Sequence, residues 1–267
     1  MRAEPSLEGS VAIVTGALGN LGPVWVSTLA EAGAMVVGID VQTEGAERLA
    51  ADVAEAGGAF HLEHADVTDR AELDEVRRRV DTRFGTPGVL INSAGIDQPP
   101  DAGARTYRVD EIPTGDFRQT LDVNLVGTFN SLQAFGVPMA AASRGSIVNI
   151  ASLYASVAPD PAFYDHLEVD PPFLKPPAYG ASKAGVVHLT RYFARLWGPS
   201  GVRVNALSPG GVLGDQDAEF TRKYCARVPL GRMAEASDLA GPLLFLASDA
   251  SGYVTGHELR VDGGFTA

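Results

Sequence analysis

The amino-acid sequence predicts an α/β fold in which a doubly wound parallel sheet lies between two layers of helices. Short, almost entirely apolar runs alternate with longer stretches of helical periodicity, the pattern of parallel strands covered on both faces. A glycine-bearing turn joins the first apolar run to the first helical stretch, and no repeat or interdomain linker divides the 267 residues. Right-handed crossovers then wind the sheet in both directions, so we expect a single domain over residues 1–267.

The expected strands are apolar runs of strand length, and the expected helices are the longer stretches that follow them. The strands are Val11–Val14, Met35–Ile39, Phe60–Ala65, Val89–Ile91, Ser146–Ile150, Val202–Leu207 and Glu258–Val261. The helices are Leu21–Ala32, Glu44–Ala56, Ala71–Arg83, Thr114–Ala142, Tyr179–Trp197 and Ala236–Ser248. The one compositional break, Val157–Ala178, is rich in proline and aspartate and precedes the Tyr179 helix.

Composition and charge exclude several classes of protein. Hydrophobic residues make up 45% of the chain and charged residues 20%, which is enough for one domain with a full core. The net charge of -12 argues against a nucleic-acid partner. The polar start of the chain lacks a signal-peptide core, and no apolar run reaches the ~18 residues of a membrane span. The single cysteine, Cys225, fits a reducing compartment, so we expect a cytoplasmic protein without a membrane partner.

The turn Thr15–Gly22 joins a strand to a helix and favours a bound nucleotide. In such a turn, backbone N–H groups and the helix N-terminus lie where a pyrophosphate binds. Gly16 permits the tight turn, and Gly22 permits close packing of the helix on the strand. We expect Gly16, Asn20 and Leu21 to contact the cofactor; the alternative is a glycine turn without a ligand.

Asp40 favours NAD over NADP. It ends the second strand, where a carboxylate accepts hydrogen bonds from the adenosine ribose and repels a 2′-phosphate. No arginine or lysine occurs in Val41–Thr43 or Ala17–Asn20. The alternative is an aspartate that merely ends a strand at the surface.

Two further strand ends carry candidate cofactor contacts. Asp66 and Val67 follow the third strand, where a carboxylate can accept from the adenine amino group. Asn92, Ala94 and Gly95 follow the fourth, where small residues let the backbone approach a ribose. Each motif alone is equally compatible with a plain turn.

Tyr179 and Lys183 are four residues apart, so on a helix they share one face. A tyrosine titrates near ~10 and is a poor base at neutral pH, and a nearby ammonium favours the phenolate. We therefore expect Lys183 to lower the pKa of Tyr179. Such pairs also occur by chance on exposed helices.

These motifs, in this order, resemble the short-chain dehydrogenase/reductase family, which has a Rossmann-type fold. The resemblance runs from Ser10 to Gly264. The motifs that carry it are Thr15–Gly22, Asp66-Val67, Asn92–Gly95, Asn124, Ser152, Tyr179 with Lys183, Ser208–Gly210 and Val261–Gly264. It implies hydride transfer between a nicotinamide and a secondary alcohol or ketone, with no metal.

The resemblance also implies residue roles. Tyr179 is the general acid/base, Ser152 hydrogen-bonds the reacting oxygen, and Lys183 lowers the Tyr179 pKa and binds the nicotinamide ribose. Asn124 holds the water that links Lys183 to solvent. Pro209, Gly210 and Val212 border the nicotinamide.

Three positions depart from the family pattern. Asn20 replaces the middle glycine of the turn, where its side chain can cap the helix or touch a phosphate. Ser93 replaces an asparagine, which is a mild change. Gly214 stands where a threonine often binds the nicotinamide carboxamide, and Asp215 or Gln216 are the candidates to replace that contact.

The largest departure is an insert at residues 154–178. Ser152 and Tyr179 lie 27 positions apart, whereas the family typically leaves about a dozen. Because both ends are tied to catalytic residues, we expect the insert to cover the active-site mouth, with Tyr154, Tyr164 and His166 as candidate substrate contacts alongside Ser152. The alternatives are a surface loop or a subunit contact.

The segments Ala151–Asp160 and Ser208–Tyr224 resemble a branch of the family found in bacterial sugar pathways, including nonulosonic-acid biosynthesis. That resemblance implies a sugar-like or polyol substrate. The C-terminal region and the Ala236–Leu246 helix resemble the family's tetramer-forming surfaces, which implies a homotetramer or homodimer. The alternatives are an NAD-binding sensor or scaffold without turnover, an enzyme acting on a non-sugar alcohol or ketone, and an epimerase or dehydratase.

Overall fold

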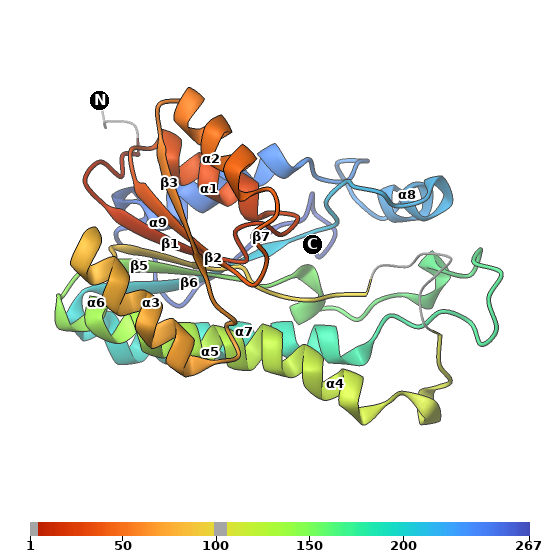
Figure 1. Cartoon of the computed structure of the whole chain (residues 1–267). Helices are drawn as coiled ribbons and strands as arrows, with labels where there is room; N and C mark the ends of the chain where they lie inside the picture. Colours follow the sequence, from red (N-terminus) through yellow and green to blue (C-terminus); the bar gives the residue numbers. More distant parts are fainter. Residues whose placement is uncertain (1–4, 99–105) are drawn as a thin grey trace.

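The structure is a computed structural model that describes residues 5–98 and 106–267, and it confirms the predicted fold (Figure 1). The strands form one parallel sheet in the order β3-β2-β1-β4-β5-β6-β7. They are β1 (Val11–Thr15), β2 (Met35–Asp40), β3 (Ala59–His64), β4 (Val89–Asn92), β5 (Gly145–Ile150), β6 (Val202–Pro209) and β7 (Glu258–Val261). The order reverses between β1 and β4, which places a crevice at the carboxyl ends of these strands.

Helices cover both faces of the sheet (Figure 1). One layer holds α1 (Gly22–Glu31), α2 (Ala46–Glu55) and α9 (Ala240–Ala247). The other holds α3 (Arg70–Arg83), α4 (Thr114–Leu121), α5 (Gly127–Ser131), α6 (Val137–Ala141) and α7 (Pro177–Trp197). A buried apolar cluster fills the space between the sheet and each layer. Within the described ranges, no helix has the length and apolar character needed to cross a membrane.

The long helix expected at 114–142 is present, but two π-helical turns interrupt it. They lie at Asp122–Val126 and Leu132–Gly136, between α4, α5 and α6. The wider turn at Asp122–Val126 carries the buried Asn124. Such turns often occur at functional sites.

The sequence prediction missed α8 (Ala218–Cys225). The element is only eight residues long, too short for apolar periodicity to stand out. Two local signals were nevertheless present. Asp217 caps the helix by accepting from Phe220 N, and Phe220 and Tyr224 share one buried face.

A third apolar cluster lies beyond the edge of the sheet, where the insert packs on α8. Phe163 of the insert is buried, and its ring centroid lies 6.1 Å from that of Phe220 and 5.8 Å from that of Tyr224. Tyr164 stacks on Phe220 at 5.7 Å and contacts Phe173 at 4.9 Å. Residues 154–178 are therefore packed through aromatic rings rather than lying as a loose surface loop.

The glycine turn is close-packed, as predicted. Gly16 has φ +69, and a Cβ added there would lie 2.8 Å from Ala94 Cα. A Cβ on Gly22 would lie 2.3 Å from the carbonyl oxygens of Gly16 and Ala17. Only glycine lets α1 start this close to β1, so both glycines shape the crevice at the switch point.

Candidate active site

Ser152, Tyr179 and Lys183 come together at the carboxyl edge of the sheet. Ser152 follows β5 and begins the short 3-10 turn η4 (Leu153–Ala155), while Tyr179 and Lys183 lie on the first turns of α7. The Ser152 hydroxyl hydrogen-bonds the Tyr179 phenol. The Lys183 ammonium lies 5.7 Å from the Tyr179 ring centroid and donates to the Ile150 carbonyl at 2.8 Å.

Burial dominates the electrostatics of this group. It raises the pKa of Tyr179; the Asp97 carboxylate adds to that shift, and the Ser152 hydrogen bond opposes it. Burial also lowers the pKa of Lys183 to about 8. The prediction that Lys183 holds the Tyr179 pKa below its usual value is therefore wrong for this structure. The Lys183 ammonium donates to the Ile150 carbonyl, and desolvation of the phenolate is the largest cause of the raised Tyr179 pKa.

Asn124 lies beside Lys183. Its Oδ1 accepts from Ile96 N at 2.7 Å, and its Nδ2 donates to Ile96 O at 3.0 Å and Ser182 Oγ at 3.1 Å. A Cβ added to Gly95 would lie 3.2 Å from Asn124 Oδ1 and 3.6 Å from Lys183 Nζ. The chain after β4 therefore passes directly over both groups. The water-holding role of Asn124 stays a prediction.

Asp40 is tied to the glycine turn. Its Oδ2 accepts from Leu18 N at 2.9 Å, and its Oδ1 accepts from Gln42 N at 3.0 Å. Each oxygen retains a lone pair for a further donor. The Asp66 carboxylate accepts from Thr68 N at 2.8 Å, and the neighbouring Val67 is buried.

The end of β4 is held against β1 by residues that the sequence analysis did not single out. Thr15 Oγ1 accepts from Ser93 N at 3.1 Å and Ala94 N at 3.2 Å, and Trp25 Nε1 donates to Ser93 Oγ at 2.9 Å. The serine at position 93 is thus part of the packing. The sequence signal for this packing was the place of Thr15 as the first residue of the glycine turn.

The Asn92 side chain points into the protein interior. Its Nδ2 donates to Asn149 Oδ1 at 2.8 Å, and Asn149 in turn donates to Thr190 at 2.9 Å. Asn92 Oδ1 is buried without a hydrogen-bond partner among the described residues. The Asn92 side chain therefore orders β4 and β5 against α7, and any contact with a ribose falls to the backbone that follows.

Two expectations about replaced residues have different outcomes. Helix α1 starts after Leu21 without a side-chain cap, so the prediction that Asn20 caps it is wrong; Asn20 lies exposed on the turn, and a phosphate contact stays a prediction. Gln216 accepts from Gly214 N at 2.7 Å and donates to Val212 O at 3.0 Å. The Gln216 side-chain amide thus bridges the turn around Gly214, the position at which the family often has a threonine.

The segment expected to border the nicotinamide is anchored to β7. Pro209 ends β6, paired with Val261, and Gly210 N donates to Val261 O at 2.9 Å. A Cβ on Gly210 would lie 2.8 Å from Asp262 Cα. Val212 bridges to Ala234. The backbone here is therefore held at the same edge as Tyr179.

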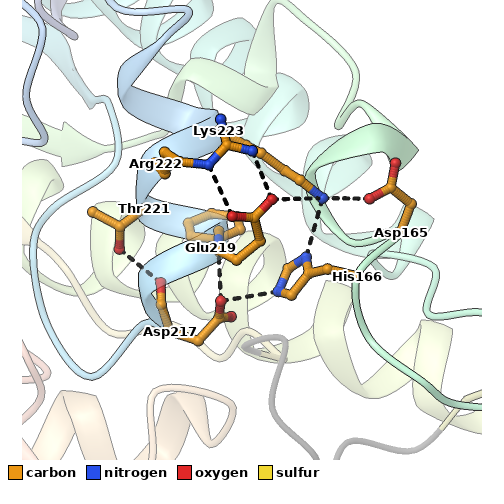
Figure 2. Close-up of polar contacts among 8 residues, drawn as sticks. Asp165, His166, Asp217, Glu219, Thr221, Arg222 and Lys223 are labelled. Atoms are coloured by element: carbon orange, nitrogen blue, oxygen red, sulfur yellow. Dashed lines mark hydrogen bonds and ion pairs between the residues drawn. The ribbon is translucent and has the colours of Figure 1, made fainter.

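The three candidate substrate residues of the insert lie at different depths. The Tyr154 ring meets Tyr179 edge-on at 6.5 Å, and its hydroxyl hydrogen-bonds Tyr164. Tyr164 is buried in the aromatic cluster. His166 bridges to α8: its Nε2 lies 2.9 Å from Asp217 Oδ1 and its Nδ1 lies 3.3 Å from Lys223 Nζ (Figure 2). Of the three, only Tyr154 has a ring contact with Tyr179.

A cavity of about 210 Å³ opens against Tyr179. Its walls come from the chain after β4, from α4 with the residues before it, and from the end of the insert. It is lined by Ile96, Asp97, Gln98, Tyr107, Ile112, Asp116, Phe117, Gln119, Thr120, Leu174, Pro176, Pro177, Ala178 and Tyr179. Sequence reasoning missed Asp97, Asp116 and Gln119. Only Asp97, which closely follows the Asn92–Gly95 motif, carried a usable signal.

The residues at this edge fit a dinucleotide. Gly16 and Gly22 keep the turn free of side chains, the N-terminus of α1 faces the crevice, and Asp40 lies where β2 ends. In the part of the chain that the structure describes, no group of three or more His, Cys, Asp or Glu side chains is arranged to hold a metal ion.

The lowered pKa of Lys183 predicts a pH-dependent stability. Because it is about 8 in the folded protein and ~10.4 in the unfolded chain, the unfolded chain binds more protons between these values. The free energy of unfolding should therefore rise with pH in that window, and the buried charge destabilises the protein below it. Lys183→Met should abolish this rise and stabilise the protein at neutral pH by roughly 3 kcal/mol. Denaturant unfolding at several pH values measures both effects; equal slopes in the two proteins would contradict the prediction.

The chain is similar to characterised dehydrogenases over nearly its whole length. The family model described as "Enoyl-(Acyl carrier protein) reductase" matches residues 16–266. D-threitol dehydrogenase of Mycolicibacterium smegmatis is 38% identical, covering 97% of this chain and 94% of that one. Cis-4-hydroxycyclohexanecarboxylate dehydrogenase of Sinomonas cyclohexanicum is 34% identical, covering 96% of each chain.

A solved structure agrees in fold. The gluconate 5-dehydrogenase of Burkholderia cenocepacia J2315, in complex with NADP and tartrate, superposes with a TM-score of 0.85 at 32% identity, covering 98% of this chain and 96% of that one. The expected likeness to a nonulosonic-acid branch finds no support among these relatives. The matches span almost the whole chain, and the site carries the serine, tyrosine and lysine in one place. The chain therefore belongs to the short-chain dehydrogenase/reductase family of NAD(P)-dependent oxidoreductases.

Proposed function

We propose that this protein is an NAD-dependent dehydrogenase that oxidises a secondary alcohol of a polyol or sugar-like substrate to a ketone. The observation that carries the proposal is the meeting of Ser152, Tyr179 and Lys183 beside the glycine turn, next to a mostly apolar cavity that also carries a few polar residues. The reaction type follows from these groups. The cofactor and the substrate class rest on further residues.

The roles follow from the chemistry of each group. Ser152 donates a hydrogen bond to the reacting oxygen, and Tyr179 takes the hydroxyl proton onto its phenol oxygen. Oxidised nicotinamide, when bound, supplies the acceptor for the hydride that leaves the carbinol carbon, and a positive charge near the phenol. Because burial raises the pKa of Tyr179, the phenolate depends on positive charge, and Lys183 has the required sign.

The cavity beside Tyr179 supports a polyhydroxylated substrate. Asp97, Asp116, Gln119 and Thr120 contribute side chains that hydrogen-bond hydroxyl groups. The related enzymes from Mycolicibacterium smegmatis and Burkholderia cenocepacia are named for a sugar alcohol and a sugar acid. The alternative is a non-sugar ring alcohol, which the name of the Sinomonas cyclohexanicum relative favours.

A cofactor-binding sensor without turnover is the competing class. It has no use for a proton-transfer group in hydrogen-bond contact with a serine, which this site has. An epimerase or dehydratase on the same fold would differ in its product.

We also propose that copies of this chain associate into a homotetramer. The outer surface of α6 and α7 exposes Val137 (55%), Tyr192 (58%) and Leu196 (52%). Apolar side chains gathered on helices in this way favour association. Static light scattering at micromolar concentration should give about four times the mass of one chain; a monomer would refute the proposal.

Tyr179→Phe tests the reaction. The variant should keep NAD binding and lose turnover by about a hundredfold or more, because the proton acceptor is gone while the ring remains. Reduced-nicotinamide absorbance with polyols, sugar acids and apolar alcohols measures turnover. Tyr253→Phe, an exposed tyrosine, is the matched control and should match wild type. Equal activity in Tyr179→Phe would refute the role, and wild-type turnover confined to apolar alcohols would refute the substrate class.

Asp40→Asn tests the cofactor preference. Loss of the carboxylate charge should lower the ratio of kcat/KM for NAD over NADP by about tenfold or more, chiefly by lowering the KM for NADP. Asp52→Asn on the exposed face of α2 removes the same charge and should leave the ratio unchanged. A wild-type enzyme that prefers NADP, or an unchanged ratio in Asp40→Asn, would contradict the assignment.

A further inference from the structure

Lys175, near the end of the insert, is nearly buried beside the catalytic group. Its side chain is 7% exposed, and its ammonium donates to Asp97 Oδ2 at 2.6 Å and to the Gln98 carbonyl at 2.9 Å. Both acceptors lie on the chain that follows β4. The contact thus joins two segments that each form a wall of the cavity against Tyr179.

The pair lies against the ring of Tyr179. Lys175 Nζ is 5.4 Å from the ring centroid, close to the 5.7 Å of Lys183 Nζ. Two ammonium groups therefore face one ring, one from α7 and one from the insert. The Asp97 carboxylate acts in the opposite sense, since it raises the pKa of Tyr179 and of Lys183.

The insert is already fastened elsewhere, so Lys175 is not needed merely to hold it. Its aromatic rings pack on α8. Asp165 pairs with Lys223, as Figure 2 shows, and Asp160 pairs with Arg227. Only the Lys175 member of the pair is buried, and desolvating its ammonium offsets much of the attraction to Asp97, so the pair is a poor source of stability. Its position beside Tyr179 is what distinguishes it.

We propose that Lys175 is a positioning residue for the catalytic tyrosine: paired with Asp97, it closes the insert onto the chain after β4 and neutralises the carboxylate beside the phenol. This rests on the proposed dehydrogenase function. The insert then supplies part of the electrostatic setting for proton transfer. Without Lys175, the Asp97 charge would face the Tyr179 phenolate that accepts the proton, with no cation to compensate it.

Other groups also face Tyr179 and set the background against which the pair acts. Lys183 lies on the same helix, and Tyr154 approaches from η4. Asp116 and Tyr107 line the same cavity. Asp97 raises the pKa of Lys183 and of Tyr154 as well, so Asp97→Asn acts on these neighbours too, and its effect is compared with that of the double variant.

The test is the pH profile of kcat/KM for alcohol oxidation, whose rising limb follows deprotonation of Tyr179. Lys175→Met leaves an unpaired carboxylate and should move this limb to higher pH by about one unit. Asp97→Asn leaves an unpaired ammonium and should move it to lower pH by a similar amount. The double variant removes both charges and should return the limb toward wild type.

Controls separate charge from structure. Lys175→Arg keeps the cation and should keep the wild-type profile. Asp165→Asn breaks another ion pair of the insert, one made with Lys223 of α8, and should not move the limb. A purely structural role predicts instead that both single variants shift the limb in the same direction or not at all, with a higher KM. That result would overturn the proposal.

A second measurement remains decisive if no substrate is turned over. The ultraviolet difference titration of each protein against its own Tyr179→Phe counterpart reports ionisation of that phenol alone. Opposite shifts in Lys175→Met and Asp97→Asn support the positioning role even if the proposed reaction fails. If neither variant shifts the titration of Tyr179, the positioning role is overturned even if the wild-type protein is an active dehydrogenase.

Discussion

The site depends on the parallel pairing of β1 with β4, because this is where the strand order reverses and the crevice opens. Ordinary ladder bonds align the two strands, and Thr15 Oγ1 then takes two backbone N–H groups at the end of β4. Those bonds bring Ala94 so close to Gly16 that no side chain fits there. The same chain continues over Asn124 and Lys183 to Asp97, so one register places both the glycine turn and one wall of the cavity against Tyr179.

Desolvation is the main cost at the group formed by Tyr179 and Lys183; the Asp97 carboxylate adds to its effect on Tyr179 and opposes its effect on Lys183. Burial disfavours both the phenolate of Tyr179 and the ammonium of Lys183, as their shifted pKa values show. The insert brings the Lys175 ammonium to this group, where it pairs with the Asp97 carboxylate. The aromatic rings of the insert supply the packing that holds it in place.

The insert also shows why spacing alone did not reveal the roles of its residues. His166 and Tyr164 were equally plausible as substrate contacts with Tyr154, because all three are polar or aromatic residues of one segment. In the folded chain His166 joins α8 and Tyr164 is buried, which leaves Tyr154 beside Tyr179. The positions of the His166 and Tyr164 side chains depend on α8, a helix too short to be recognised from apolar periodicity in the sequence.

The sequence by itself determined the sheet, the layers of helices and the shared helix face of Tyr179 and Lys183, because strand burial and helical spacing are local patterns; Ser152 joined them through the family resemblance. It also placed Gly16 and Gly22, since a turn this tight excludes side chains. Only the tertiary structure decided the electrostatics. Burial and residues distant in the chain decide three features: the pKa of Tyr179 is raised, Lys183 donates to the Ile150 carbonyl, and Lys175 pairs with Asp97. Solvent exclusion is a property of the whole fold, and no spacing of residues encodes it.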